Sequence, residues 1–254
     1  MAWNPNVYNK FKSERFLPFD DLLALVKIKS GIRVLDLGCG TGELTRKLAD
    51  ALPDSNVLAI DASAEMLQDS KAFANDNVQF AQKTIEAQVE SGEKFDLIFS
   101  NAAIQWVQNH RELLPKIIAS INSGGQLALQ LPDQNNNTAN QILNALADEQ
   151  PFKNELQHWK RDSPVLDIDS YARLLFENGS SSITVFEKVY PLVLQDSETV
   201  FEWVSGTALI PYLERLSNEL KTQFSNTLRN RLALAFPESP AFYPFKRIII
   251  EAKF

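Results

Sequence analysis

Hydrophobic and polar positions follow one another along the chain in blocks that predict strands and helices in turn. Short apolar runs rich in β-branched residues are typical of buried strands, and apolar residues three or four positions apart are typical of helices on a core. Strands are expected at 34–37, 56–60, 78–81, 95–99, 126–131, 183–190 and 247–252. Helices are expected at 20–29, 44–52, 113–123, 138–150, 168–177, 199–213 and 217–235. This alternation predicts an α/β fold with a doubly wound, mostly parallel sheet.

The order of these elements also predicts how the chain is divided. The helices at 199–213 and 217–235 interrupt the run of strands, so we expect an α-helical cap inserted before the last strand. Residues 1–30, rich in aromatic side chains, are expected to form an N-terminal lid or helix. Residues 31–135 are expected to form the ligand-binding core, and residues 136–254 the cap helices plus the last core strands.

A glycine-rich turn follows the first strand and precedes a helix. Gly38, Gly40 and Gly42 stand in alternate positions there. A residue without Cβ adopts positive φ and lets the backbone approach a ligand closely, so this turn predicts a nucleotide site. Asp61 ends the next strand about twenty residues later, where a carboxylate usually holds a ribose hydroxyl pair. Two features therefore agree at the expected separation.

The spacing of the turn bears on which nucleotide is bound. A dinucleotide fingerprint has the form G-x-G-x-x-G, whereas Glu43 occupies the position of the third glycine here. An acidic residue suits a pyrophosphate poorly, whereas S-adenosylmethionine brings no phosphate and carries a cationic sulfonium. We therefore expect S-adenosylmethionine as the cofactor and keep a nicotinamide-dependent oxidoreductase as an alternative.

The composition of the chain limits the kinds of partner that we expect it to bind. The 254 residues carry a formal net charge of −7 with an estimated pI of 5.0, so no global field favours nucleic acid or an anionic membrane. Cys39 is the only cysteine, and the two histidines are too few for a zinc-ligand cluster, so no metal is expected. No stretch approaches the roughly 18 apolar residues of a membrane span. We expect a cytoplasmic monomer that acts on a small molecule.

Several segments carry a family resemblance. Residues 34–42 resemble motif I of class I S-adenosylmethionine-dependent methyltransferases, and residues 60–67 resemble their second motif, which implies a Rossmann-like methyltransferase fold. Segments from both ends and the middle of the chain are similar to trans-aconitate 2-methyltransferases, namely 3–8, 14–15, 100–106, 130–133, 203–207 and 244–253. The resemblance implies an O-methyltransferase that forms a methyl ester on a small polycarboxylic acid such as trans-aconitate.

The motifs and the resemblance together give a set of candidate site residues. Cofactor contacts are expected from Asp36, Gly38, Cys39, Gly40, Gly42, Asp61, Ala62, Met66, Thr84, Ile85, Asn101 and Trp106. Substrate contacts are expected from Trp3, Tyr8, Arg15, Gln105, Gln130 and Trp203, with Arg161 and Arg247 as further cations for the acid. A carboxylate is already ionised at pH 7, so no general base is needed, and Asn101 and Gln105 are expected to act by positioning.

Two positions depart from the family pattern. Ile210 stands where the family usually has an arginine before the proline, and Thr84 replaces an acidic residue near the adenine. The first departure bears on the substrate and the second on cofactor affinity. The alternatives are therefore a malonyl-carrier-protein O-methyltransferase and a non-catalytic S-adenosylmethionine-binding protein.

Overall fold

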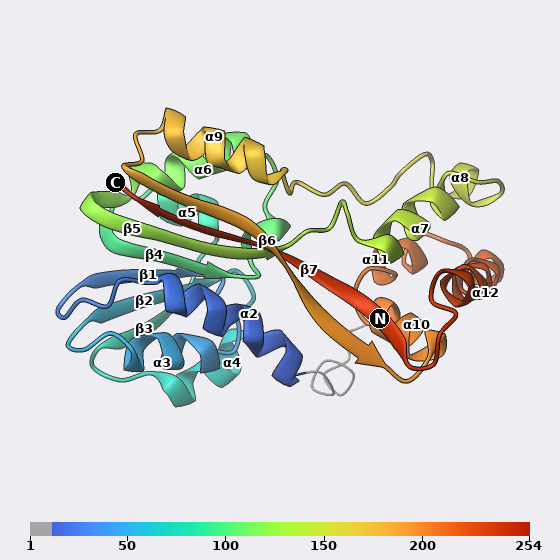
Figure 1. Cartoon of the computed structure of the whole chain (residues 1–254), viewed down its shortest axis with the longest axis horizontal. Coiled ribbons are helices and arrows are strands. Elements are labelled where there is room, and N and C mark those ends of the chain that lie inside the picture. The colour runs from blue at the N-terminus through green and yellow to red at the C-terminus, as the bar shows by residue number, and fades with distance from the viewer. Residues whose placement is uncertain (1–11) are drawn as a thin grey trace. The chain divides into compact units, whose positions relative to one another are not determined.

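The computed structural model describes residues 12–254, with side chains from Phe16 onward, and the chain forms two compact units. The sheet unit comprises residues 17–132, 164–188 and 247–254. The cap unit comprises residues 133–163 and 189–246, and the described residues before Leu17 are grouped with it. The strands and helices of both units are drawn in Figure 1.

The sheet has seven strands in the order β3-β2-β1-β4-β5-β7-β6. Their bounds are β1 Arg33–Leu37, β2 Asn56–Asp61, β3 Val78–Gln82, β4 Phe95–Asn101, β5 Ile121–Pro132, β6 Ser182–Leu194 and β7 Ala241–Lys253. Strands β1 to β5 pair in parallel, whereas β7 runs antiparallel to β5. The order reverses between β1 and β4, and a ligand site is expected beyond the carboxyl ends of strands at such a switch point. The predicted α/β fold is confirmed.

Helices cover both faces of the sheet unit (Figure 1). On one face Phe19 and Leu22 of α2 pack in the same core as Val34 of β1. On the other face Ile117 and Tyr171 pack in a second core that contains Leu35 and Leu37. Val34 and Leu35 of β1 therefore enter opposite cores, which explains why two apolar residues stand next to each other in this strand.

The helices and 3-10 turns of the chain fall between the strands and in the cap unit. Helix α2 spans Lys12–Leu25 and belongs to the sheet unit from Leu17 onward. The others in the sheet unit are α3 Glu43–Asp50, α4 Leu67–Ser70, η1 Lys71–Phe73, α5 Ile85–Val89, η2 Ile104–Trp106, α6 His110–Ala119 and α9 Ile168–Glu177. In the cap unit they are α7 Thr138–Ala147, α8 Phe152–Glu155, α10 Ser197–Ser205, α11 Ile210–Leu213 and α12 Asn218–Ala235.

Three helices differ most from the sequence expectation. Helix α2 begins at Lys12 rather than residue 20 and contains Pro18. Helix α6 ends at Ala119, so the glycine pair at 124–125 lies inside β5, where the Gly124 N–H donates to the Phe254 carbonyl at 2.7 Å. The helix expected at 199–213 is two helices, because α10 ends at Ser205 and the chain turns at Gly206.

The cap unit has its own hydrophobic core. Helices α7, α10 and α12 contribute buried apolar side chains to it, and so do the outer ends of β6 and β7. Its buried aromatic residues include Phe152 and Phe224, whose rings meet edge to face at 4.9 Å. The cap therefore includes residues 138–155 as well as the helices that the sequence places before the last strand.

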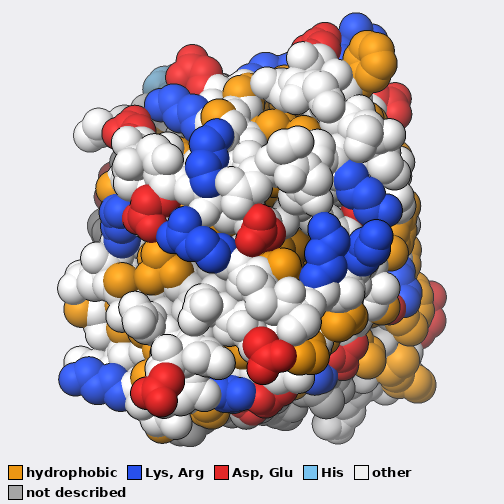
Figure 2. Space-filling model, turned by 90° about the vertical axis from the view of Figure 1, so that its left-hand side faces the viewer, with side chains coloured by type: hydrophobic (Ala, Val, Ile, Leu, Met, Phe, Trp, Pro, Cys, Tyr) orange, Lys and Arg blue, Asp and Glu red, His pale blue; other side chains and the backbone are white. Residues whose placement is uncertain are grey.

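The face of the sheet unit turned to the viewer in Figure 2 carries Lys and Arg side chains with Asp and Glu among them. Arg33 at the start of β1 pairs with Glu93 at 3.2 Å. Lys116 of α6 pairs with Glu90 at 3.2 Å. Exposed pairs of this kind contribute about 0 to 1 kcal/mol each, so the packed cores dominate stability. Among the described helices, none is long and apolar enough to cross a bilayer.

Candidate functional site

The glycine turn lies at the carboxyl end of β1 and leads directly into α3. The N–H groups of Gly38 and Cys39 both donate to the Ile60 carbonyl, at 2.8 and 2.9 Å, which fixes the turn against β2. Gly38, Gly40 and Gly42 have φ of 76°, 56° and 84°, in the region that favours glycine. The turn therefore needs glycine for its backbone conformation at all three positions.

Asp61 ends β2 beside this turn. Its carboxylate accepts the Gly40 N–H at 2.9 Å and the Ser63 N–H at 2.8 Å. A carboxylate offers about four acceptor positions, so these two bonds orient the group while leaving acceptor capacity for a ligand hydroxyl. The structure thus brings Gly40 and Asp61 together, as their spacing predicts.

Asp36 of β1 is a buried carboxylate, only 5% exposed, beneath the same turn. Thr45 of α3 donates its hydroxyl to the Asp36 carboxylate at 2.6 Å. Burial raises the Asp36 pKa from 3.8 to about 6, the Thr45 bond opposes the rise, and the negative Asp61 adds to it. A cation bound nearby would favour the ionised carboxylate, so the edge is electrostatically suited to a positively charged ligand.

Asn101 and Gln130 lie opposite each other at the ends of β4 and β5. The Gln130 amide donates to the Asn101 side-chain oxygen at 2.8 Å, and the Arg247 guanidinium donates to the Gln130 side-chain oxygen at 3.2 Å. Gln130 and Arg247 are buried, whereas Asn101 is partly exposed. This chain of bonds orients Asn101, and it gives Arg247 a partner within the sheet unit.

The loop after β4 is held by a buried histidine. His110 bonds the Tyr171 hydroxyl through Nδ1 at 2.5 Å and the Ile104 carbonyl through Nε2 at 2.9 Å, and burial lowers its pKa. The neighbouring Gln105 is 6% exposed, and its amide nitrogen donates a hydrogen bond to the Ala102 carbonyl at 2.6 Å. Gln105 Oε1 is buried and has no hydrogen-bond partner within the described part of the chain.

The other predicted cofactor residues lie on the loops around this edge. The Met66 methyl group would be 3.2 Å from a Cβ placed on Gly40, so Met66 lies over the turn. Thr84 caps α5 by accepting the Ala87 N–H at 3.2 Å, directly before Ile85. Ala62 is exposed, and so is Trp106 at 65%. Burial raises the pKa of the Cys39 thiol far above its ordinary value, so Cys39 is an inert part of the turn.

The predicted substrate residues are less fully placed. Trp3 and Tyr8 lie outside the described residues, and Arg15 is described only as part of the α2 backbone. Trp203 of α10 belongs to the cap core, where its ring meets Phe245 edge to face at 5.4 Å. A substrate contact by Trp203 stays a prediction, and its packing role is clear.

Truncation of Trp203 tests that packing role. Trp203→Ala removes a large ring that is 7% exposed, so we expect the free energy of unfolding to fall by about 3 to 5 kcal/mol. Trp203→Phe retains an aromatic ring and should lose much less. Urea unfolding followed by circular dichroism measures both variants. Equal losses for the two would contradict a contribution from ring packing.

Two residues of the site escaped the sequence reasoning. Thr45 holds Asp36, and a Cβ placed on Gly38 would lie 2.1 Å from the Ala103 Cβ. A threonine nine positions after Asp36, in the first turn of the helix, is the only sequence signal for the first contact. The second depends on how the loop after β4 folds back over β1, which no local pattern reveals. Within the described residues, no three His, Cys, Asp or Glu side chains gather as metal ligands.

Comparison with known proteins places this site in a family. Residues 28–181 match the family model of the methyltransferase domain. The chain is 40% identical over 258 residues to the trans-aconitate 2-methyltransferase of Deinococcus radiodurans, covering 99% of this chain and 98% of the relative. It is 34% identical over 256 residues to the enzyme of the same name from Rhodococcus jostii, covering 99% of both chains.

Solved structures agree at the level of the fold. The YcgJ protein from Bacillus subtilis aligns with a TM-score of 0.60 and 17% identity, covering 93% of this chain and 97% of that one. Phosphoethanolamine N-methyltransferase 2 of Haemonchus contortus, solved with S-adenosyl-L-methionine, aligns with a TM-score of 0.55 and 16% identity, covering 93% of this chain and 52% of that one.

The switch point, the glycine turn and the carboxylates beside it define the site of a nucleotide-binding α/β enzyme. With the matches just described, the chain belongs to the methyltransferase family, and within it to the group whose curated members are named trans-aconitate 2-methyltransferase.

Proposed function

We propose that this chain transfers the methyl group of S-adenosylmethionine to a carboxylate of trans-aconitate, forming a methyl ester. The observation that carries the proposal is the glycine turn bonded to Asp61 above the buried Asp36, in a chain similar over its whole length to relatives of that name. Monomeric state and a cytoplasmic setting remain predictions from the sequence.

The residues at the sheet edge fit this cofactor. The positive φ values of the glycines and the Met66 methyl group over Gly40 make a cradle that a Cβ would fill. Two carboxylates, Asp36 and Asp61, suit a cationic ligand with ribose hydroxyls. Glu43, which stands where a dinucleotide fingerprint has its third glycine, suits a pyrophosphate poorly and so disfavours a nicotinamide cofactor.

The chain's part in the reaction is to bind, orient and exclude water. When bound, S-adenosylmethionine supplies an electrophilic methyl group on a sulfonium. The substrate carboxylate is ionised at neutral pH, so no side chain has to remove a proton. Asp61 would hold the ribose, the backbone of the glycine turn would lie against the cofactor, and Asn101, oriented through Gln130, would line the edge. The rate enhancement would come from positioning and electrostatics.

Methyl transfer from labelled S-adenosylmethionine to a panel of acids tests the proposal. We expect a monomethyl ester from trans-aconitate, weaker transfer to other di- and tricarboxylates, and none to the trimethyl ester, which has no free carboxylate. Malonyl carrier protein belongs in the same panel. Transfer to the carrier protein alone would favour the first alternative, and cofactor binding without transfer to any acid would favour a non-catalytic binding protein.

A further inference from the structure

The loop after β4, residues 102–109, has an unfavourable backbone conformation at both of its ends. Ala102 has φ of 55° and Asn109 has φ of 56°, in the left-handed region that residues with a Cβ seldom adopt. Such residues raise the energy of the folded chain, and they persist only where the surrounding structure enforces them. The conformation of this loop therefore depends on contacts outside its own backbone.

The same loop contains the buried Gln105 oxygen that lacks a partner within the described part of the chain. A buried acceptor without a hydrogen bond costs free energy, because it has lost water and gained nothing in return. Left-handed residues and an unpaired amide oxygen thus occur within eight residues of each other. Strain of this kind is typical of loops at functional sites.

His110 connects this loop to the segment that leads into α9. Its Nε2 carries the hydrogen, because the Ile104 carbonyl, 2.9 Å away, can only accept. In the neutral ring Nδ1 is then an acceptor, so the Tyr171 hydroxyl donates to it at 2.5 Å. The Tyr171 oxygen in turn accepts the Leu166 N–H at 3.3 Å. One chain of hydrogen bonds therefore fixes the loop to residues about sixty positions later.

The loop that His110 holds lies directly on the glycine turn. A Cβ placed on Gly38 would be 2.1 Å from the Ala103 Cβ, so Ala103 occupies the space beside Gly38 that a side chain would need. Ala103 is the residue before Ile104, which His110 bonds. All of these residues belong to the sheet unit. A shift of the loop would therefore change the shape of the edge at which the cofactor is expected.

His110 lies among uncharged groups. Burial lowers its pKa, and the carbonyls of Ile104 and Val107 oppose the drop. Strand β5, which packs against α6, contains no charged residue.

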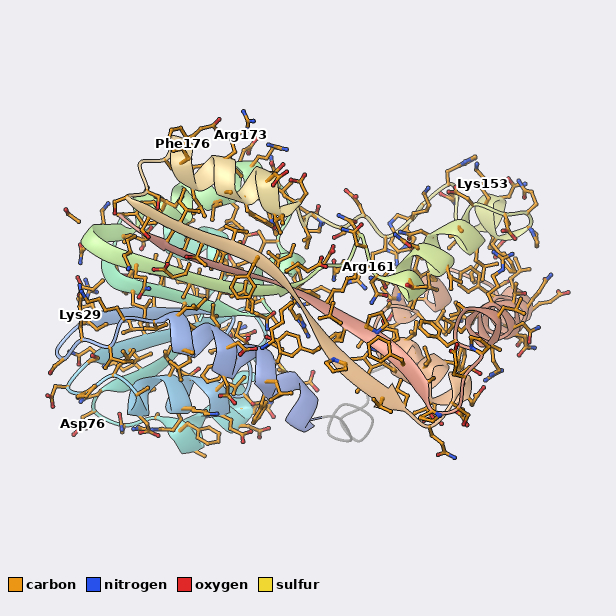
Figure 3. All side chains as sticks on the ribbon, in the orientation of Figure 1. Lys29, Asp76, Lys153, Arg161, Arg173 and Phe176 are labelled. Carbon is orange, nitrogen blue, oxygen red and sulfur yellow. The ribbon has the colours of Figure 1, made fainter. Side chains whose placement is uncertain are left out.

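The charged side chains of the described helices around His110 are all exposed. On α6 they are Arg111, Glu112 and Lys116, and on α5 and its C-cap they are Glu86 and Glu90. On α9 and its N-cap they are Asp167, Asp169, Arg173 and Glu177. Figure 3 shows Arg173 on the side of α9 that is turned away from the strands. A protonated His110 would therefore be a buried cation without an acidic partner on these helices.

We propose that His110 is a positioning residue for the methyl transfer, which holds residues 102–106 on the glycine turn while its ring is neutral. The inference rests on the proposed function, because it assigns this loop to the cofactor edge of that reaction. A protonated ring would direct a second N–H at the Tyr171 hydroxyl, whose own hydrogen would then lose its acceptor. S-adenosylmethionine should therefore bind most tightly to the form with neutral His110.

NMR of labelled histidine tests the tautomer and this coupling in the unchanged protein, because the chain has only two histidines. His110 should be the Nε2–H tautomer at pH 7 and should titrate below its ordinary pKa. Saturating S-adenosylmethionine should lower that pKa by about one further pH unit, which corresponds to about tenfold tighter binding to the neutral form. The exposed His158 of the cap unit should show no such change.

Variants of the full-length protein test the hydrogen bonds. His110→Leu fills the site without either bond and should raise the Kd for S-adenosylmethionine about 10- to 100-fold, the range for a displaced binding group. His110→Gln should restore much of the affinity, because its amide nitrogen can donate to the Ile104 carbonyl. Tyr171→Phe removes the donor that favours neutral His110, so the loss of affinity at acidic pH should begin at a higher pH.

The dependence of the Kd on pH has a second source. The Asp36 pKa is raised to about 6, so Asp36 also loses its charge on acidification. His110→Gln retains that contribution and should lose only the part that His110 supplies. His158→Gln is the matched control, since it removes the exposed histidine, and its Kd should equal that of the unchanged protein at every pH.

The outcomes separate this inference from the proposed function. A Kd in His110→Leu within about twofold of that of the unchanged protein, with the fold retained in urea unfolding, would overturn the inference even if methyl transfer to trans-aconitate is observed. If His110→Leu does not fold, a His110 pKa that S-adenosylmethionine leaves unchanged would overturn it. Cofactor binding that depends on His110, without transfer to any acid, would support the inference and overturn the proposed function.

Discussion

Gly38→Ala should be among the most damaging single-methyl additions in the sheet unit, lowering the free energy of unfolding by about 2 to 5 kcal/mol and abolishing cofactor binding. Gly38 has φ +76°, and the added Cβ would lie 2.1 Å from the Ala103 Cβ. Left-handed backbone costs an alanine about 1 to 2 kcal/mol, and overpacking adds about 1 to 3 kcal/mol. Urea unfolding and calorimetric titration with S-adenosylmethionine measure the two effects.

Two further variants separate strain from collision. Gly92 has φ +75° with nothing within 4 Å of an added Cβ, so Gly92→Ala should show only the backbone cost. Ala103→Gly combined with Gly38→Ala removes the collision, because the next atom, the Ala103 Cα, is 3.5 Å away. The double variant should regain the part of the unfolding free energy that Gly38→Ala loses through this collision. If Gly38→Ala proves no worse than Gly92→Ala, the contact with Ala103 is unimportant.

The backbone strain at Gly38 and its collision with Ala103 differ in how well the sequence predicts them. The glycine turn itself can be predicted from the sequence, whereas the residues packed against it cannot. The alternate glycines after an apolar strand, with Asp61 at the right distance, locate the turn because local conformation and strand order decide it. The loop that carries Ala103 arrives from β4, more than sixty residues later in the chain. Its approach depends on β1 pairing with β4, a tertiary event that leaves no periodic signal near Gly38.

The cap unit shows the same limit more strongly. The segment 151–164 has no hydrophobic period, and the sequence yields Arg161 only as a lone cation. Its surroundings come from α7 and α11, which become neighbours through the packing of the cap core. The predicted continuous helix at 199–213 also fails there, because periodicity continues across Gly206 although the backbone turns. Periodicity reports which side chains are buried, and it does not report where a helix is interrupted.

Asp36→Asn should stabilise the cofactor-free protein at pH 8 and weaken its affinity for S-adenosylmethionine. The Asp36 pKa is raised from 3.8 to about 6 in the folded state, chiefly by burial. The folded protein therefore binds the proton more tightly than the unfolded chain does. The associated stability is fully present below about pH 4 and is lost as pH rises through about 6.

An uncharged amide does not undergo this loss. About two pKa units correspond to about 3 kcal/mol, so the variant should gain up to that amount at pH 8 and almost nothing at pH 4. The oxygen of the introduced amide could still accept the Thr45 hydroxyl, which keeps the local geometry. Urea unfolding at pH 4, 6 and 8 measures the gain. Asp196→Asn is a control for which the opposite change in stability is expected. The Thr199 backbone N–H lowers the Asp196 pKa, so the negative charge there stabilises the fold and its removal should destabilise the protein at pH 8.

The stability gain and the binding loss should have one cause. The ionised, buried Asp36 carboxylate destabilises the cofactor-free protein. A cationic ligand beside it makes the same charge favourable, so the Asp36 charge should strengthen cofactor binding. Thermal unfolding with and without S-adenosylmethionine should therefore show a smaller ligand-induced rise in Tm for Asp36→Asn. A variant that is less stable at pH 8 yet binds the cofactor normally would mean that the Asp36 charge is solvated or compensated in the free protein, and the electrostatic argument for this edge of the sheet would fail.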